Sequence, residues 1–121
     1  MNKTVLIVDD SDMVRRILNF TIKSAGYTVL MAEDGDDALL HFDGKDIDMV
    51  ISDLNMPNKD GIELITEIRK MPYYRFIPVV LFVSDETINT QEMISRSAAT
   101  ILFDKTFIKE KMVSTVKMMI G

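Results

Sequence analysis

The chain has 121 residues with 47% hydrophobic content, which suffices for one domain with its own core. Nineteen acidic against fourteen basic residues give a net charge of -5, which disfavours non-specific binding to nucleic acid or anionic lipid. The chain has no cysteine, which excludes disulfides, thiolate metal sites and thiol nucleophiles. We expect a single domain over residues 1–121 whose partner is a protein or a small ion.

The N-terminal sequence and the hydropathy pattern bear on location. The N-terminus lacks the basic, apolar and small-residue succession of a signal peptide. No apolar stretch approaches the ~18 residues of a membrane span. We therefore expect a soluble, cytoplasmic protein without a membrane partner.

Short apolar runs alternate with longer amphipathic ones, a pattern typical of repeated βα units and a parallel sheet. Strands are predicted near 3–8, 28–32, 47–52, 79–83 and 100–103. Helices are predicted from Ser11 as N-cap to Gly26, at 35–43, from Gly61 to Pro72, at 86–97 and at 107–120. The helix at 86–97 is the weakest of these because it is rich in poor helix formers. Five strands alternating with five helices fit a three-layer α/β sandwich.

Three aspartates follow two of the predicted strands. Asp9 and Asp10 come after the run 3–8, and Asp53 comes after the run 47–52. Because ligands bind beyond the carboxyl ends of parallel strands, these side chains are expected to meet. Two carboxylates about 4 Å apart repel by roughly 4 kcal/mol at an effective dielectric constant near 20. A divalent cation with oxygen ligands, most simply Mg²⁺, would neutralise this charge.

Two further polar residues are expected at the same edge. Lys105 follows the apolar run 101–103, so its ammonium could pair with Asp53, and Ser84 follows the run 79–83. Carboxylates, cation, ammonium and hydroxyl together favour a phosphoryl-binding site over a hydrolytic pair of acids.

Plainer interpretations exist for each acidic residue. Asp9 and Asp10 alone are typical of a helix start, and Asp53 alone is typical of a turn. Alternatively, residues 10–14 fit the DxDx[TV] nucleophile motif of haloacid-dehalogenase-like phosphatases, although that interpretation leaves Asp9 without a role. His41, the only histidine, is expected to be a solvated residue on a surface helix.

Three segments taken together resemble the receiver domain of bacterial two-component response regulators. They are Val-Asp-Asp-Ser at 8–11, Ser-Asp-Leu-Asn-Met-Pro-Asn-Lys-Asp-Gly at 52–61 and Asp-Lys-Thr-Phe at 104–107. The resemblance covers essentially the whole chain, and the single-domain chemotaxis regulator is the type nearest in size. It implies a flavodoxin-like, doubly wound (βα)5 sandwich with a five-stranded parallel sheet in the order 2-1-3-4-5. That order follows from the resemblance alone.

The resemblance also implies a role for each site residue. Asp53 would accept a phosphoryl group from the phosphohistidine of a sensor histidine kinase or phosphotransfer protein. Asp10, Asp53 and the backbone carbonyl of Asn55 would hold Mg²⁺, Asp9 would bind it through water, and Lys105 would contact the phosphoryl oxygens. Such a protein catalyses only its own phosphorylation and dephosphorylation, and passes the signal to a downstream protein target.

The sequence departs from the family pattern at positions that belong to the switch. The hydroxyl residue expected at the end of the fourth strand is Val83, with Ser84 one residue later. Leu102 stands where the family usually has an aromatic residue in the fifth strand, and Ala98 replaces the glycine before that strand. Thr106 replaces the proline that usually follows the lysine. Two hypotheses remain open: a receiver switched by phosphorylation, and a degenerate receiver acting as a phosphorylation-independent protein-interaction module.

Overall fold

A computed structural model describes residues 2–83, 101–104 and 108–121 of the chain. The predicted helix at 86–97 lies outside these residues. So do Ser84, Ala98, Lys105 and Thr106.

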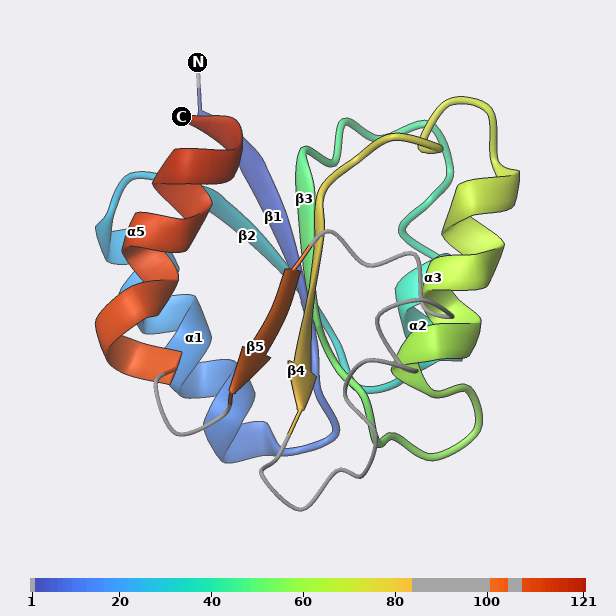
Figure 1. Ribbon diagram of the computed structural model, residues 1–121, viewed down its shortest axis with the longest axis horizontal. Helices are drawn as coiled ribbons and strands as arrows, with labels where there is room; N and C mark the ends of the chain where they lie inside the picture. The colour runs from blue at the N-terminus through green and yellow to red at the C-terminus, as the bar shows by residue number, and fades with distance from the viewer. Residues whose placement is uncertain (1, 84–100, 105–107) are drawn as a thin grey trace.

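The described chain alternates strands and helices around one parallel sheet (Figure 1). The strands are β1 Thr4–Val8, β2 Thr28–Ala32, β3 Met49–Asp53, β4 Val79–Val83 and β5 Ile101–Asp104. The helices are α1 Asp12–Ser24, α2 Gly35–Leu39, α3 Gly61–Lys70 and α5 Ile108–Ile120. The strand order is β2-β1-β3-β4-β5 with every pair parallel. The predicted doubly wound, flavodoxin-like sheet is therefore confirmed.

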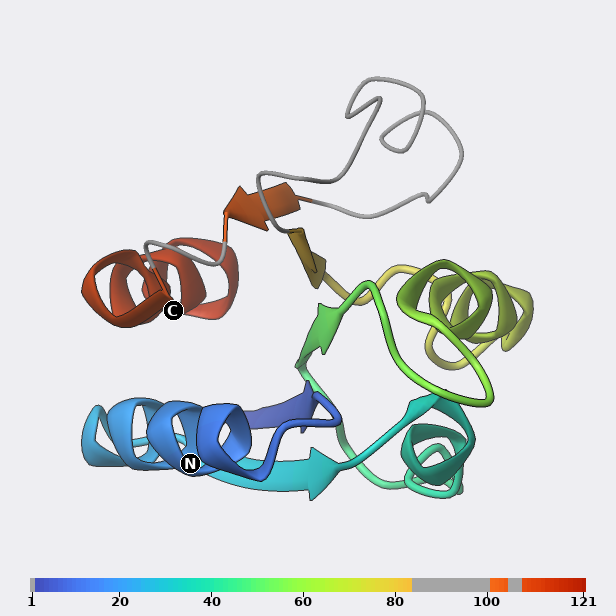
Figure 2. The same ribbon diagram turned by 90° about the horizontal axis from the view of Figure 1, so that it is seen from below.

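The sheet separates two apolar cores, because neighbouring residues of a strand point to opposite faces. Leu6 and Val8 of β1 face α2 and α3, whereas Val5 and Ile7 face α1 and α5. Seen along the sheet, α1 and α5 cover one face, and α2 and α3 cover the other (Figure 2). The central strands are buried on both faces, so their carboxyl ends emerge from a rigid support.

The helix ends place the loops that connect them to the sheet. Ser11 caps α1 by accepting a hydrogen bond from the backbone N–H of Val14, and Gly26, with φ +102°, follows its C-cap. Both ends match the prediction. Asp60 and Glu63 form a reciprocal capping box at the start of α3. Among the helices of the described ranges, none combines the length and apolar character that a membrane span requires.

The prediction for α2 was too long, because the α-helix ends at Leu39 rather than near residue 43. After that point the backbone N–H groups of Leu40, His41 and Phe42 donate to carbonyls three residues earlier, so the chain tightens into successive turns. His41 is half-buried, and its Nε2 lies 3.2 Å from the carbonyl oxygen of Met31. His41 is therefore less solvated than predicted.

Candidate functional site

The register of the central strands brings three aspartates together at the carboxyl edge of the sheet, the lower edge in Figure 1. Val8 of β1 is the Cα partner of Ser52 of β3, so the next residues, Asp9 just beyond β1 and Asp53 at the end of β3, lie side by side. Asp10 follows at once. One carboxylate oxygen from each of the three aspartates lies within 4.8 Å of the others.

The three carboxylates differ in their access to solvent. Asp9 is completely buried and Asp53 is 3% exposed, whereas Asp10 is exposed. The backbone N–H of Ser11 donates to Oδ1 of Asp9 at 2.8 Å. Arg15 donates from its guanidinium to the backbone carbonyl of Asp9, which ties the first turn of α1 to the end of β1. The site thus combines one solvent-exposed carboxylate with two buried ones.

Close packing beneath Asp53 fixes its backbone. The hydroxyl of Ser52 donates to the carbonyl oxygen of Asp53 at 2.9 Å. A Cβ atom at Gly61 would lie 2.5 Å from that same oxygen and 2.6 Å from Cδ1 of Leu81. Only glycine lets the start of α3 approach β3 this closely. Asp53 therefore has little freedom to move away from the other two aspartates.

The donor set suits a small, hard divalent cation. Carboxylate oxygens are the side-chain ligands that Mg²⁺ prefers. With Mg–O distances of about 2.0–2.1 Å, oxygens on opposite sides of the ion are roughly 4.2 Å apart. Three oxygens within 4.8 Å can therefore reach one ion with small adjustments or through a bridging water. A cation at this position would also offset the mutual repulsion of the three carboxylates.

The alternative phosphatase motif does not form one site. Asp12 lies in the first turn of α1 and pairs with Arg16 at 2.9 Å, with its side chain 65% exposed. It lies outside the three-aspartate cluster. A nucleophile and its assisting acid must face the same substrate atom. The arrangement of Asp10 and Asp12 therefore argues against a haloacid-dehalogenase-like mechanism.

The other predicted site residues are described only in part. Asn55 is exposed in the loop between β3 and α3, two residues beyond Asp53. Val83 is the last residue of β4 and is the Cα partner of Asp104 in β5. Ser84 and Lys105, which follow these strands, lie outside the described residues.

Several residues that shape the site were missed by sequence reasoning. They are Arg15, which binds the carbonyl of Asp9, and Gly61, which packs under Asp53. Asp34 and Asn58 are also among them, since their side chains join α2 to the loop after β3 at 2.8 Å. The only available signal was the turn-like composition of residues 54–61. It gave no indication of a contact with residue 34.

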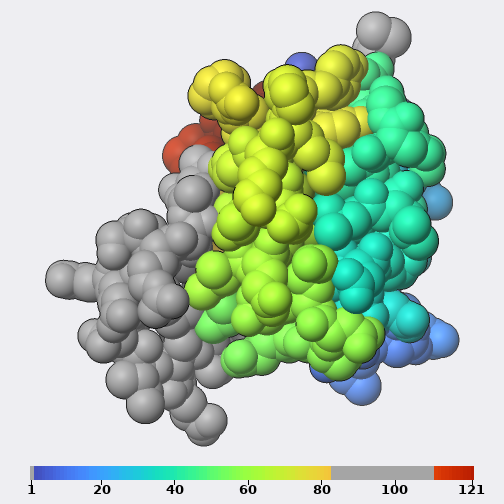
Figure 3. Space-filling view, turned by 90° about the vertical axis from the view of Figure 1, so that its right-hand side faces the viewer, coloured from blue at the N-terminus to red at the C-terminus, as the bar shows by residue number. Residues whose placement is uncertain are grey.

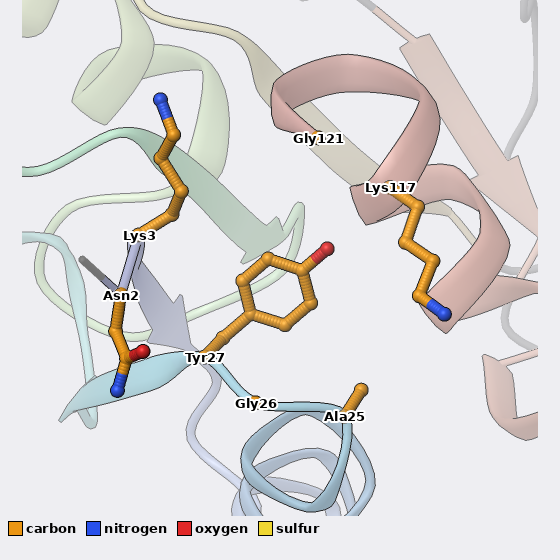
Figure 4. A pocket seen from close by; sticks show the side chains of 7 residues that line it. All are labelled: Asn2, Lys3, Ala25, Gly26, Tyr27, Lys117 and Gly121. Carbon is orange, nitrogen blue, oxygen red and sulfur yellow. The ribbon is translucent and has the colours of Figure 1, made fainter.

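A cavity of about 300 Å³ lies at the opposite, amino-terminal edge of the sheet (Figure 4). Lys3, Lys117 and the phenol of Tyr27 are among its lining groups, and none of its described lining residues is acidic. The carboxyl ends of α1 and α5 flank it, and their partial negative charge is complemented by lysines. None of its described lining residues belongs to the cluster of Asp9, Asp10 and Asp53, so this cavity is not part of the acidic site.

Comparisons with known proteins agree on one family. The family model described as "Response regulator receiver domain" matches residues 5–117. The solved structure of the chemotaxis response regulator CheY4 of Vibrio cholerae is 30% identical. It superposes with a TM-score of 0.90 over 98% of this chain and 99% of that one.

Two curated relatives are longer proteins. The CAI-1 autoinducer sensor kinase/phosphatase CqsS of Vibrio cholerae is 31% identical over 96 residues, which are 78% of this chain and 14% of that protein. The alkaline phosphatase synthesis transcriptional regulatory protein PhoP of Bacillus subtilis is 34% identical over 70 residues, 58% of this chain and 29% of that protein. The chain thus spans less than a third of either curated relative.

Proposed function

The chain belongs to the response regulator receiver domain family, and we propose that residues 1–121 act as a phosphoacceptor domain in cytoplasmic two-component signalling. In this proposal Asp53 is phosphorylated in a Mg²⁺-dependent reaction by a sensor histidine kinase or a phosphotransfer protein. The modification then switches a surface that binds a downstream protein. The domain performs only its own phosphoryl transfer and is not an enzyme with a separate substrate.

The observation that carries this proposal is the cluster of Asp9, Asp10 and Asp53, whose carboxylate oxygens lie within 4.8 Å of one another. Asp10, Asp53 and the backbone carbonyl of Asn55 would hold Mg²⁺, and Asp9 would bind it through water. When bound, the cation neutralises the charge of the carboxylates and of the phosphoryl oxygens. Positioning and charge neutralisation are what a loose phosphoryl-transfer transition state requires.

The reaction itself uses one oxygen of Asp53. This oxygen attacks the phosphorus of the donor phosphohistidine, an O–P bond forms, and the P–N bond breaks with its electron pair returning to the imidazole. Gly61 and Ser52 pack against the Asp53 backbone and limit the movement of the attacking oxygen. The entropy cost of orienting this oxygen for the transfer is therefore small. Lys105 would contact the phosphoryl oxygens. Ser84 would offer a hydroxyl in place of the one absent at Val83.

The outer face of α1 has the features of a docking surface for the protein that donates the phosphoryl group. Met13 and Phe20 are 71% and 75% exposed, seven residues apart and therefore on one side of the helix. A hollow of about 410 Å³ is lined there by Arg16, Ile17, Phe20 and Thr21. Exposed aromatic and arginine side chains are typical of protein interfaces. This face starts directly beside the acidic cluster.

Labelling with a small phosphodonor tests the proposal. Radiolabelled acetyl phosphate with Mg²⁺ should label the wild type and leave Asp53→Asn unlabelled. The matched control is Asp36→Asn, which removes an exposed carboxylate in α2 and should be labelled normally. A chelator should abolish labelling of the wild type. Equal labelling of the wild type and Asp53→Asn would exclude Asp53 as the acceptor.

A second candidate is a degenerate receiver that binds its partner without phosphorylation. It is favoured by Val83, which ends β4 one residue after Phe82, the register partner of Asp53. Valine cannot donate a hydrogen bond to a phosphoryl oxygen. Beryllofluoride mimics a phosphoryl group on a carboxylate and separates the two candidates. Changed partner affinity supports the switching receiver, whereas unchanged affinity with retained Mg²⁺ binding supports the interaction module.

A further inference from the structure

A strained turn lies in the loop that follows Asp53. Asn58 has φ +68°, and no other described non-glycine residue has a positive φ. The backbone N–H of Lys59 donates to the carbonyl of Pro57 at 2.8 Å, which closes a three-residue turn around Asn58. A turn of this size with a positive central φ is the rare, strained form of γ-turn. Such strain persists only where the surrounding structure holds it.

The first turn of α2 holds this strained turn from two sides. Nδ2 of Asn58 donates to Oδ2 of Asp34 at 2.8 Å. The backbone N–H of Gly35 donates to the carbonyl of Lys59 at 3.2 Å. Figure 3 shows α2 in cyan beside α3 in yellow-green, the helix that this loop enters. We call the two contacts together the α2 clamp.

Asp34 serves both the helix and the loop. Its Oδ1 caps α2 by accepting from the backbone N–H of Asp37 at 2.8 Å, while its Oδ2 accepts from Asn58. These bonds, with that from Asp37 first, lower the pKa of Asp34 below its usual value. A Cβ atom at Gly35 would lie 2.6 Å from the carbonyl oxygen of Lys59. The α2 clamp is therefore a close contact that tolerates little displacement.

The loop is also fixed at its base. The backbone N–H of Gly61 donates to the carbonyl of Leu54 at 2.9 Å, so the loop closes on itself directly after Asp53. Asn55 lies between this base and the α2 clamp. With both ends of so short a segment fixed, few backbone conformations remain for Asn55.

We infer that Asp34 and Asn58 are positioning residues for the divalent cation, because their contact orients the Asn55 backbone carbonyl toward the acidic cluster. This inference rests on the proposed function, in which that carbonyl is a ligand. Neither side chain touches the ion in this account. The α2 clamp sets cation affinity through the loop, so α2 becomes a structural determinant of the phosphorylation site.

Removal of the side-chain contact of the α2 clamp, without a change in the backbone, provides the test. Asn58→Gly deletes the amide, while glycine adopts a positive φ without strain. We expect Asn58→Gly to weaken Mg²⁺ binding by about three- to tenfold, the range for loss of one net hydrogen bond. Titration with Mg²⁺ followed by amide NMR shifts measures this. Asp34→Ser, whose hydroxyl can still cap α2 but has no second oxygen for Asn58, should weaken binding similarly.

A double variant and a charge control separate positioning from electrostatics. The exchange Asp34→Asn with Asn58→Asp keeps the net charge and restores a donor and an acceptor at the contact, so Mg²⁺ affinity should recover. Asp36→Asn removes an exposed charge from the same turn and should shift affinity less than Asn58→Gly. In the metal-free protein, hydrogen exchange at the Gly35 amide should be faster in Asn58→Gly than in the wild type.

The outcomes are distinct. Unchanged Mg²⁺ affinity in both Asn58→Gly and Asp34→Ser, with normal binding by the wild type, would overturn the positioning role and leave the proposed function intact. If the wild type itself fails to bind Mg²⁺, the proposed function and this inference fail together. If Asp34→Ser does not fold, Asn58→Gly and the double variant still decide.

Discussion

Asp9 and Asp53 are neighbours across the sheet because each directly follows one member of a register pair, Val8 in β1 and Ser52 in β3. Both are nearly or fully buried, at 0% and 3% exposure. A cation that binds these carboxylates in the folded chain and not in the unfolded one should stabilise the fold.

Removal of one carboxylate from the cluster should reduce cation binding and relieve repulsion. We expect Asp10→Asn to weaken Mg²⁺ binding more than tenfold, because a charged ligand is lost. Without metal, the variant should have a free energy of unfolding, measured in urea, about 1 kcal/mol higher than the wild type, the repulsion of two charges about 4 Å apart in water. Urea denaturation with and without Mg²⁺ measures both effects.

Asp12→Asn is the matched control for that experiment. Asp12 is exposed and pairs with Arg16 outside the cluster, so its loss should leave Mg²⁺ affinity within about twofold of the wild type, as expected for an exposed ion pair. The cluster would not be the cation site if Asp10→Asn and Asp12→Asn bound Mg²⁺ alike. The stabilisation of the wild type by Mg²⁺ should rise with the logarithm of its concentration above the dissociation constant.

The exposed face of α1 should affect transfer from a protein donor and not from a small one. Phe20→Ala removes an aromatic side chain that is 75% exposed. We expect kcat/KM for phosphotransfer from the cognate kinase to fall about five- to tenfold, as for a moderate interface residue. Labelling by acetyl phosphate should be unchanged, because Phe20 lies two turns along α1 from the cluster.

Phe76→Ala is the corresponding control at the other edge of the sheet. Phe76 is 89% exposed just before β4, so it matches Phe20 in chemistry and differs in position. Its substitution should leave both reactions unchanged. Equal slowing of kinase transfer by Phe76→Ala would exclude α1 as the specific donor surface.

The sheet and the acidic cluster follow from local sequence. Apolar runs such as 3–8 are long enough for buried strands, and the residue after each run must emerge at the carboxyl edge. Asp9 and Asp53 were placed there by this reasoning alone. The order of the strands needed the family resemblance, because alternating βα units are compatible with several orders.

Other features depend on contacts that no local pattern encodes. Asn58 and Asp34 are 24 residues apart, and each alone is typical of a turn or a helix cap. The α-helix α2 ends early because the next backbone N–H groups donate to carbonyls three residues earlier instead of four. Helix propensity alone does not predict this change, because tertiary packing can override it. Gly61 is necessary because Asp53 and Leu81, from two different strands, leave no room for a Cβ atom at this position.

Gly61 should therefore be essential for both stability and phosphorylation. In Gly61→Ala, the new Cβ would lie 2.5 Å from the Asp53 carbonyl oxygen and 3.1 Å from Cα of Leu54. The backbone must shift, so we expect a loss of about 1–3 kcal/mol in the free energy of unfolding. Labelling of Asp53 by acetyl phosphate should also slow, because the carboxylate oxygen of Asp53 moves with the strand end.

Gly26→Ala is the control that separates the effect on stability from the effect on labelling, since Gly26 has φ +102° with no atom within 4 Å of an added Cβ. It should lose about 1–2 kcal/mol through backbone strain and keep normal labelling. Normal labelling of folded Gly61→Ala would contradict the role of this contact in holding Asp53.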